Sequence, residues 1–197
     1  MNLNNHRIIG ITGKKFSGKD TLGSFFVDNH NYKRLAYADT LKDACQTIFN
    51  LTDEQLYGDQ KETVDPFWQK KPREILQFVG TDLFRKHIHE LMPDVGNNIW
   101  VKVVERKILD GIRENPDACF VITDVRFPNE AELVKNLGGI MIKVNRDSCN
   151  NSNDNHASET ELDNIPYDYL IDNNGTKEEL FRSLINSLGA HNCASDK

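Results

Sequence analysis

A glycine-rich segment near the amino terminus constrains the fold of this chain more than any other feature. Residues 13–21 read GKKFSGKDT and follow the apolar run 7–12. The spacing matches the phosphate-binding loop GxxxxGK, in which backbone N–H groups surround phosphate oxygens and the lysine reaches the β- and γ-phosphates. A glycine turn that only caps a helix is the alternative, but it does not require a strand, a loop and a helix in this order. The segment therefore predicts an α/β fold that binds a nucleoside triphosphate.

The loop departs from the general pattern at Asp20, where a serine or threonine hydroxyl normally binds Mg²⁺. Either Asp20 or Thr21 must take this role, directly or through water. We favour Thr21 close to the phosphates, with Asp20 polarising a metal-bound water. The residues expected to bind ATP are Gly13, Lys14, Ser17, Gly18, Lys19, Asp20 and Thr21.

Apolar runs typical of strands alternate with segments of helical periodicity along the chain. The expected strands are 7–12, 33–38, 119–123, 140–145 and 168–172. This alternation predicts a five-stranded parallel sheet flanked by helices, in a single P-loop kinase-like domain over residues 1–197. No strand is expected between Leu41 and Pro116, and Pro72 begins a helix there. We interpret about 41–116 as a helical acceptor-binding insertion.

The last part of the chain contains a polar segment and a helix. Residues 146–161 are rich in asparagine, serine and aspartate, a composition that indicates a lid or mobile loop. Thr176 and Glu179 form the pattern of a capping box before the apolar positions of a final helix. Residues 191–197 are expected to be a flexible tail.

The charge balance and the cysteines limit the partners of the chain. Its 30 acidic and 24 basic residues give a net charge of -6, which opposes binding to a nucleic-acid polymer. The four cysteines lack metal-ligand spacing and predict free thiols. No stretch approaches the ~18 apolar residues that a membrane span needs. We expect a cytoplasmic protein that acts on a small molecule, with no nucleic-acid polymer and no membrane as partner.

Two aspartates follow apolar runs, at the sheet edge where α/β proteins bind ligands. If the strand before Asp124 lies beside the first strand, this carboxylate can organise the waters of Mg²⁺, and Arg126 can hold an acceptor phosphate bidentately. Asp39 would orient the acceptor. Each aspartate could instead be a helix N-cap. The expected metal site therefore comprises Asp20, Thr21 and Asp124.

Transfer of a phosphoryl group between two anions requires several cations. The cationic residues beside motifs and expected strand ends are Lys19, Lys42, Arg73, Arg85, Arg126 and Arg146. A surface role is the alternative for each of them. The residues expected to take part in catalysis are Lys19, Asp124, Arg126 and Arg146.

Six motifs in a fixed order connect the chain with a known family. They are Gly18–Thr21, Ala38–Asp43, Pro72–Gln77, Gly80–Asp82, Asp124–Glu130 and His156–Glu159. Together they resemble the deoxynucleoside monophosphate kinases of phages and large DNA viruses, and the similarity extends from about residue 8 to 175. Aspartate after the loop lysine is usual in that family. Thr40, where many relatives have proline, and the asparagine-rich lid depart from its pattern.

The resemblance implies a nucleoside monophosphate kinase fold, with ATP and Mg²⁺ used to convert a deoxynucleoside 5′-monophosphate to its diphosphate for DNA precursor synthesis. It also hints at a homodimer and, for a viral member, at the host cell cytoplasm. Carried over by position, the expected substrate-binding residues are Asp39, Lys42, Arg73, Gln77, Thr81, Asp82, Arg85, Arg126, Asn129 and Glu159. Trp100 is expected to fill the core.

The expected mechanism is direct in-line transfer, for which an anionic acceptor needs no strong general base. Phosphomevalonate kinase is one alternative, since it resembles this chain in the Gly-Lys-Asp loop and in a Ser-Glu-containing lid. The segment 73–85 argues against it. A P-loop NTPase that switches a partner protein is the other alternative, and ATP turnover without a monophosphate would reveal it.

Overall fold

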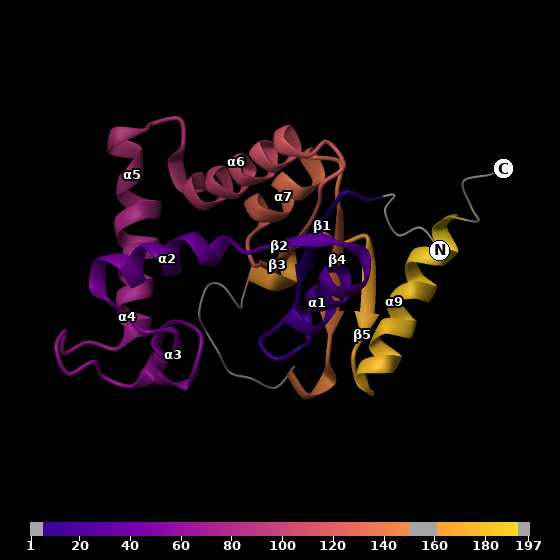
Figure 1. Cartoon of the computed structure of the whole chain (residues 1–197), viewed down its shortest axis with the longest axis horizontal. Helices are drawn as coiled ribbons and strands as arrows, with labels where there is room; N and C mark the ends of the chain where they lie inside the picture. The colour runs from indigo at the N-terminus through magenta and orange to yellow at the C-terminus, as the bar shows by residue number, and fades with distance from the viewer. Residues whose placement is uncertain (1–5, 150–160, 193–197) are drawn as a thin grey trace. The chain divides into compact units, whose positions relative to one another are not determined.

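The computed structural model describes residues 6–149 and 161–192 of the 197-residue chain. The chain divides into two compact units. We call them the sheet unit, Met1–Ala36 with Lys107–Lys197, and the helical unit, Tyr37–Arg106. Figure 1 shows the elements of both.

The sheet unit is built on five parallel strands. They are β1 (Ile8–Thr12), β2 (Tyr32–Leu35), β3 (Cys119–Val125), β4 (Ile140–Asn145) and β5 (Tyr169–Asp172). Their order is β2-β3-β1-β4-β5, and each neighbouring pair is parallel. The predicted five-stranded parallel sheet is thereby confirmed. Because β1 is central, the loop that follows it emerges between the carboxyl ends of β3 and β4.

Helices cover both faces of this sheet, as expected for parallel strands. The helices in question are α1 (Lys19–His30), α7 (Pro128–Asn136), α9 (Lys177–Asn192) and the end of α6 (Ile99–Glu114). One core cluster joins alternate strand residues to α1 and α9, and includes Ile9, Ile11, Val121, Ile142, Ile171, Leu22, Phe26, Leu180 and Leu184. On the other face a Cβ on Gly10 would lie 2.4 Å from Met141 Sδ and 3.0 Å from Val134 Cγ2. Helix α7 covers this second face.

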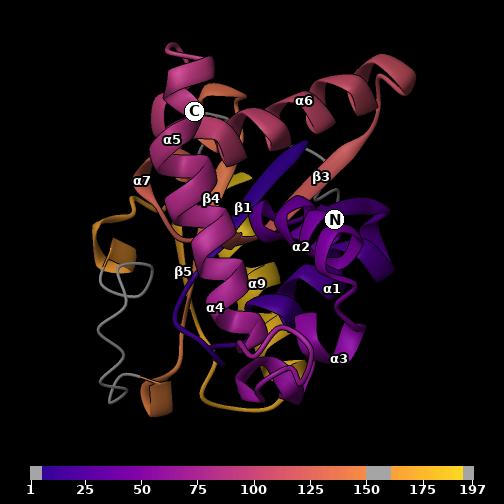
Figure 2. The ribbon, with the colours of Figure 1, turned by 90° about the vertical axis from the view of Figure 1, so that its left-hand side faces the viewer.

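The helical unit contains no strand among its residues, which the structure describes in full. Its elements are α2 (Tyr37–Phe49), α3 (Asp53–Leu56), the 3₁₀-helix Asp59–Glu62, α4 (Pro72–Gln77), the π-helix Phe78–Arg85, α5 (Lys86–Leu91), the 3₁₀-helix Gly96–Asn98 and the start of α6. In Figure 2, α4, the π-helix and α5 follow one another along one helical column. A separate core of Cys45, Leu51, Leu56, Ile75 and Val79 lies inside this unit.

The prediction that a strand ends at Asp39 is wrong. Strand β2 ends at Leu35, and α2 begins at Tyr37, which places Asp39 in the first helical turn. Residues 36–38, Ala-Tyr-Ala, contain no β-branched side chain that would favour an extended backbone. A carboxylate in the first turn also complements the helix dipole.

The last helix begins with the predicted capping box and continues to Asn192, two residues into the segment that was expected to be a flexible tail. The Thr176 N–H donates to Glu179 Oε2 over 2.7 Å, and the Glu179 N–H donates to Thr176 Oγ1 over 3.2 Å, so the predicted capping box precedes α9. Most of the predicted lid and residues 193–197 lie outside the described residues. Within the described residues, Cys45, Cys119 and Cys149 are free thiols. None of the helices described has the length and apolar character needed to cross a membrane.

Candidate functional site

The loop between β1 and α1 has a backbone that only glycine permits at two positions. Gly13 has φ 148° and Gly18 has φ 104°. A Cβ on Gly13 would lie 2.4 Å from the carbonyl oxygen of Val144, and one on Gly18 would lie 2.3 Å from Asn173 Nδ2. Both conformation and space therefore exclude a side chain. The loop is held against the ends of β4 and β5.

Lys19 is the first residue of α1, and its side chain folds back over the loop. The ammonium donates hydrogen bonds to the carbonyl oxygens of Gly13 and Lys14, each over 2.7 Å. The residue is only 9% exposed. A buried charge is costly without such partners. The cation is thus fixed at a helix N-terminus, where it can meet phosphate oxygens.

Asn173, which follows β5, anchors the loop and was not among the residues expected from the sequence. Its side-chain amide donates to the carbonyl oxygen of Ser17 over 2.8 Å, and its backbone N–H donates to Asn145 O over 2.8 Å. It follows directly after β5 and is 7% exposed. A polar residue directly after a predicted strand was the available signal, the same one that selected Asp124.

Three buried hydroxyls around the loop have no hydrogen-bond partner among the described residues. They belong to Thr12 at the end of β1, Ser17 in the loop and Thr123 near the end of β3. Most buried polar atoms in proteins have a partner. Ser17, which belongs to the loop itself, therefore marks a place where a phosphate or a hydrated metal ion could bind.

The described residues contain no group of three or more His, Cys, Asp or Glu side chains that could hold a metal ion by themselves. Mg²⁺ is commonly bound by one or two carboxylates together with substrate phosphates. Asp20 lies in the first turn of α1 and Asp124 lies near the end of β3. This donor set fits a metal ion that arrives with the nucleotide.

Strand β3 lies beside β1, as the interpretation of Asp124 required. Gly10 pairs with Ile122, whereas Thr12 pairs with Val125, so two residues of β3 stand opposite Ile11. Such a bulge redirects side chains and is frequent next to active sites. It lies at Asp124 itself, which is inside the strand rather than after it.

Glu130 fixes the backbone that follows β3. Its carboxylate accepts hydrogen bonds from the N–H groups of Arg126, over 2.8 Å, and Phe127, over 3.2 Å. Glu130 is only 2% exposed. The two bonds satisfy donors at the N-terminus of α7, whose first turn includes Asn129. Asp124, Arg126 and Asn129 are thus brought together around one turn.

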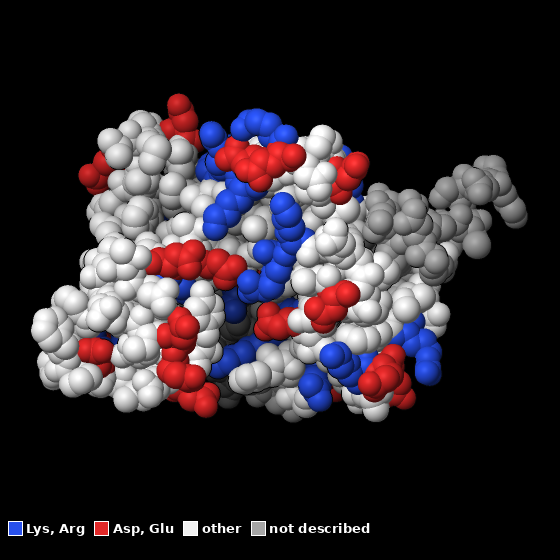
Figure 3. Space-filling view, in the orientation of Figure 1, with Lys and Arg blue, Asp and Glu red and all other residues white. Residues whose placement is uncertain are grey.

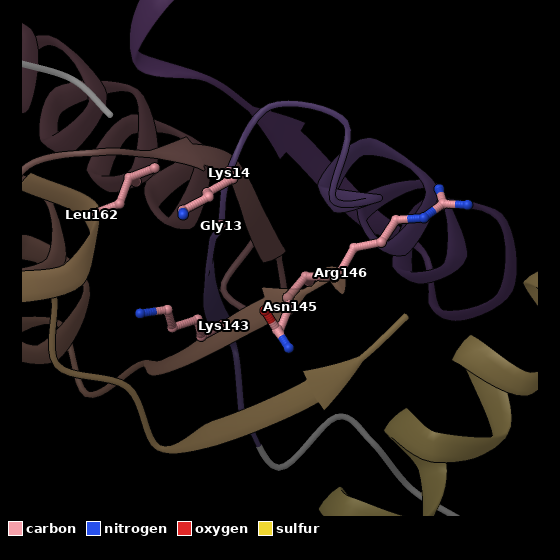
Figure 4. Close-up of a pocket in the computed structure, with 7 residues that line it drawn as sticks. Gly13, Lys14, Lys143, Asn145, Arg146 and Leu162 are labelled. Carbon is pink, nitrogen blue, oxygen red and sulfur yellow. The ribbon is translucent and has the colours of Figure 1, made fainter. Parts of the chain in front are cut away.

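A pocket lies between the loop and the end of β4. It is lined by Gly13, Lys14, Lys143, Val144, Asn145, Arg146 and Leu162. In Figure 4 the side chains of Lys14 and Lys143 point to the same side, and that of Arg146 points away from them. Lys143 was not predicted, although a lysine that interrupts an apolar strand was a visible signal.

The helical unit carries the other predicted substrate-binding residues. Asp39 and Lys42 lie on α2, and the ammonium of Lys42 is 4.0 Å from the ring centroid of Tyr57. Arg73 and Gln77 lie on α4, and Thr81, Asp82 and Arg85 lie on the π-helix. Glu159, with His156 and Ser158, falls outside the described residues.

Two of these residues are engaged in ion pairs. Arg73 pairs with Glu62, and Asp82 pairs with Lys86 over 2.6 Å. All four side chains are between 44% and 62% exposed. Exposed ion pairs contribute at most about 1 kcal/mol, so a bound anion could compete with them.

The π-helix is held from inside the helical unit by Trp100. The indole N–H donates to the carbonyl oxygen of Gly80 over 3.0 Å, and the ring lies 5.4 Å from that of Phe84. A Cβ on Gly80 would lie 2.6 Å from Leu41 Cδ2. Trp100 is 7% exposed, which confirms its predicted place in the core. π-helical turns are often found at functional sites.

The surface charge is mixed on the face shown in Figure 3, where acidic and basic side chains lie interspersed. A protein that binds a nucleic-acid polymer usually presents a basic stripe or patch.

Comparisons with known proteins place these features in context. A family model described as deoxynucleotide monophosphate kinase matches residues 64–184. A protein of Acanthamoeba polyphaga mimivirus, named as a candidate deoxynucleotide monophosphate kinase, is 44% identical over 182 residues, which cover 90% of this chain and 94% of that protein. The deoxynucleoside-5′-monophosphate kinase of Escherichia phage T5 is 40% identical over 85 residues, which cover 43% of this chain and 30% of that protein. Among solved structures, the dephospho-CoA kinase from Campylobacter jejuni aligns with a TM-score of 0.45 and 15% identity, over 93% of this chain and 96% of its own.

Proposed function

The chain belongs to the deoxynucleotide monophosphate kinase family, and from this premise we propose how its residues carry out the reaction. The protein is a nucleoside monophosphate kinase that phosphorylates deoxynucleoside 5′-monophosphates with ATP. The observation that carries our proposal is the paired hydrogen bonding of the Lys19 ammonium to Gly13 and Lys14, which fixes a buried cation above a loop of backbone N–H groups.

The loop and Lys19 hold the β- and γ-phosphates of the donor. Because Lys19 is already fixed, little reorganisation is needed when charge develops on the transferred group. Arg126, whose backbone is held by Glu130, binds phosphate oxygens on the acceptor side, and Arg146 adds a further positive charge. The reaction is an in-line displacement in which no protein atom forms a covalent intermediate.

Mg²⁺ would be held by Asp20, Thr21 and Asp124, directly or through water. When bound, the ion would offset negative charge on the β- and γ-phosphates. The bulge at Asp124 and the unpartnered hydroxyl of Ser17 support this assignment.

Most of the other residues that we propose for acceptor recognition lie in the helical unit. We assign Gln77 and Asp82 to the base of the acceptor and Arg73 or Arg85 to its phosphate, with Asp39, Lys42, Thr81, Asn129 and Glu159 as further contacts. A homodimer and a location in the host cell cytoplasm are carried over from the resemblance to viral kinases. Light scattering after gel filtration would test the dimer.

The substrate class is tested by an ADP-release assay against ribo- and deoxynucleoside monophosphates and phosphomevalonate. We expect turnover with at least one deoxynucleoside monophosphate, and background rates with phosphomevalonate and with ATP alone. Turnover of phosphomevalonate, or equal ATP hydrolysis without any acceptor, would contradict the assignment.

Replacing Trp100 by phenylalanine should weaken the acceptor site while leaving the donor site intact. The change keeps an aromatic ring in the core and removes the only donor that Trp100 offers the buried carbonyl of Gly80. Losing this buried hydrogen bond should lower the free energy of unfolding by about 0.5–1.5 kcal/mol. We expect the KM for the monophosphate to rise several-fold, with the KM for ATP unchanged, in steady-state kinetics paired with urea unfolding.

Trp68 offers a matched control in the same unit. Its indole N–H donates to the carbonyl oxygen of Phe49 over 2.8 Å, but the residue is 39% exposed, so water can replace the bond. Trp68→Phe should therefore change stability and acceptor KM little. If both variants lose the same stability and keep the same KM, the bond to Gly80 does not support the acceptor site.

A further inference from the structure

Lys143 is a charged residue in a strand that is otherwise apolar up to its last residue. β4 reads IMIKVN, and the neighbours of Lys143, Ile142 and Val144, are 0% and 1% exposed. The strand is paired on both sides, with β1 and with β5. Lysine is rarely found at such positions, because partial burial of its charge is costly. This position therefore calls for a physical explanation.

The register of the sheet places Lys143 next to the phosphate loop. It pairs with Thr12, the residue directly before Gly13. Residues paired across neighbouring strands project to the same face of the sheet. The side chain of Lys143 therefore leaves β4 where the loop begins.

The pocket at this place is lined by two lysines. Lys14 and Lys143 both line it, and Figure 4 shows their side chains directed to the same side, towards Leu162. The ammonium of Lys143 also lies 5.5 Å from the ring centroid of Tyr167, which steadies the side chain. A phosphate group that entered this pocket would be attracted by both ammonium groups.

We infer that Lys143 is a further phosphate-binding residue, which together with Lys14 contacts a phosphate group of the donor nucleoside triphosphate. The inference rests on the proposal that residues 13–19 hold the donor phosphates. The donor is the source indicated here, because Gly13 and Lys14, two residues of that loop, form one wall of the pocket. Lys143 adds positive charge on the β4 side of the loop.

The test is equilibrium binding of ATP, inorganic tripolyphosphate and a deoxynucleoside monophosphate, measured by titration calorimetry on the full chain. Lys143→Met keeps most of the aliphatic stem against Tyr167 and removes the charge. We expect this variant to bind ATP and tripolyphosphate about three- to tenfold more weakly, with a smaller dependence of both affinities on salt. Its affinity for the monophosphate should be unchanged. Lys143→Arg should restore most of the affinity.

The control is Lys33→Met, which removes an exposed lysine from the edge strand β2 of the same sheet and should bind all three ligands as the natural protein does. Natural affinity of Lys143→Met for ATP and tripolyphosphate, or a loss confined to the monophosphate, would overturn the inference. A Lys19→Met variant measured in parallel distinguishes a failure of the proposed role of the loop from a failure of the proposed role of Lys143. If it binds ATP normally, the proposed role of the loop fails, whereas weak binding by Lys19→Met with normal binding by Lys143→Met refutes only the role of Lys143.

Discussion

Replacing Lys19 by methionine is expected to abolish phosphoryl transfer, with kcat lowered by at least about 10³-fold. The ammonium is fixed by two carbonyl oxygens of the loop, and no other described side chain makes those two bonds. Methionine fills a similar volume without the charge. The loss should appear in an ADP-release assay at saturating ATP and monophosphate.

The fold should survive this change. The carbonyl groups of Gly13 and Lys14 lose a donor, which costs about 1–3 kcal/mol, but the variant no longer buries a charge. Urea unfolding followed by circular dichroism would report the difference. Lys15→Met is the matched control, because Lys15 lies in the same loop with its ammonium 5.0 Å from the ring of the exposed Phe16. Comparable activity of the Lys19 and Lys15 variants would remove the loop lysine from the mechanism.

Replacing Arg126 by alanine should lower kcat/KM for the monophosphate by roughly 10²–10³-fold. Arg126 lies just after the bulge of β3. The backbone N–H groups of Arg126 and Phe127 both donate hydrogen bonds to the carboxylate of Glu130, which holds the backbone at this point. Lysine keeps the charge but cannot form two parallel hydrogen bonds to one phosphate. Arg126→Lys should therefore recover only part of the loss, while ATP affinity stays within about twofold of normal in both variants.

Arg113 provides the comparison for a surface arginine. It pairs with Asp110 over 2.6 Å, and its side chain is 70% exposed. Arg113→Ala should leave kcat/KM unchanged, because such pairs contribute at most about 1 kcal/mol. Full activity of Arg126→Ala, or full rescue by lysine, would mean that Arg126 provides no bidentate contact to the acceptor.

The parts of the fold that the sequence predicted are those where local pattern and tertiary structure agree. The expected strand 140–145 coincides with β4, because an apolar run there, interrupted only by Lys143, ends at the polar residue Asn145. The loop at Gly13–Lys19 was predicted because its glycines and lysine occupy a fixed spacing that few other structures require. Pro72 begins α4 as expected.

Other features depend on contacts whose partners no local pattern identifies. Asn173 and Lys143 reach the loop through strand register, which is set by pairing between distant segments. The bulge at Asp124 is visible only in the pairing with β1. Arg73 looked available for a phosphate, but its partner Glu62 is supplied by a separate 3₁₀-helix.

The π-helix Phe78–Arg85 has a consequence for how this segment can evolve. A π-helical turn contains more residues than an α-helical turn, so the segment is equivalent to an α-helix that has accepted an insertion. Deleting one residue would therefore return the segment to an ordinary α-helix and leave the side chains of α5 on nearly the same face, because the π-helical turn absorbs the extra residue locally. Only the side chains inside the segment, Asp82 and Arg85 among them, would change position around the helix axis. A one-residue gap in this segment of a relative would therefore mark a local change in acceptor recognition, with the rest of the helix unchanged.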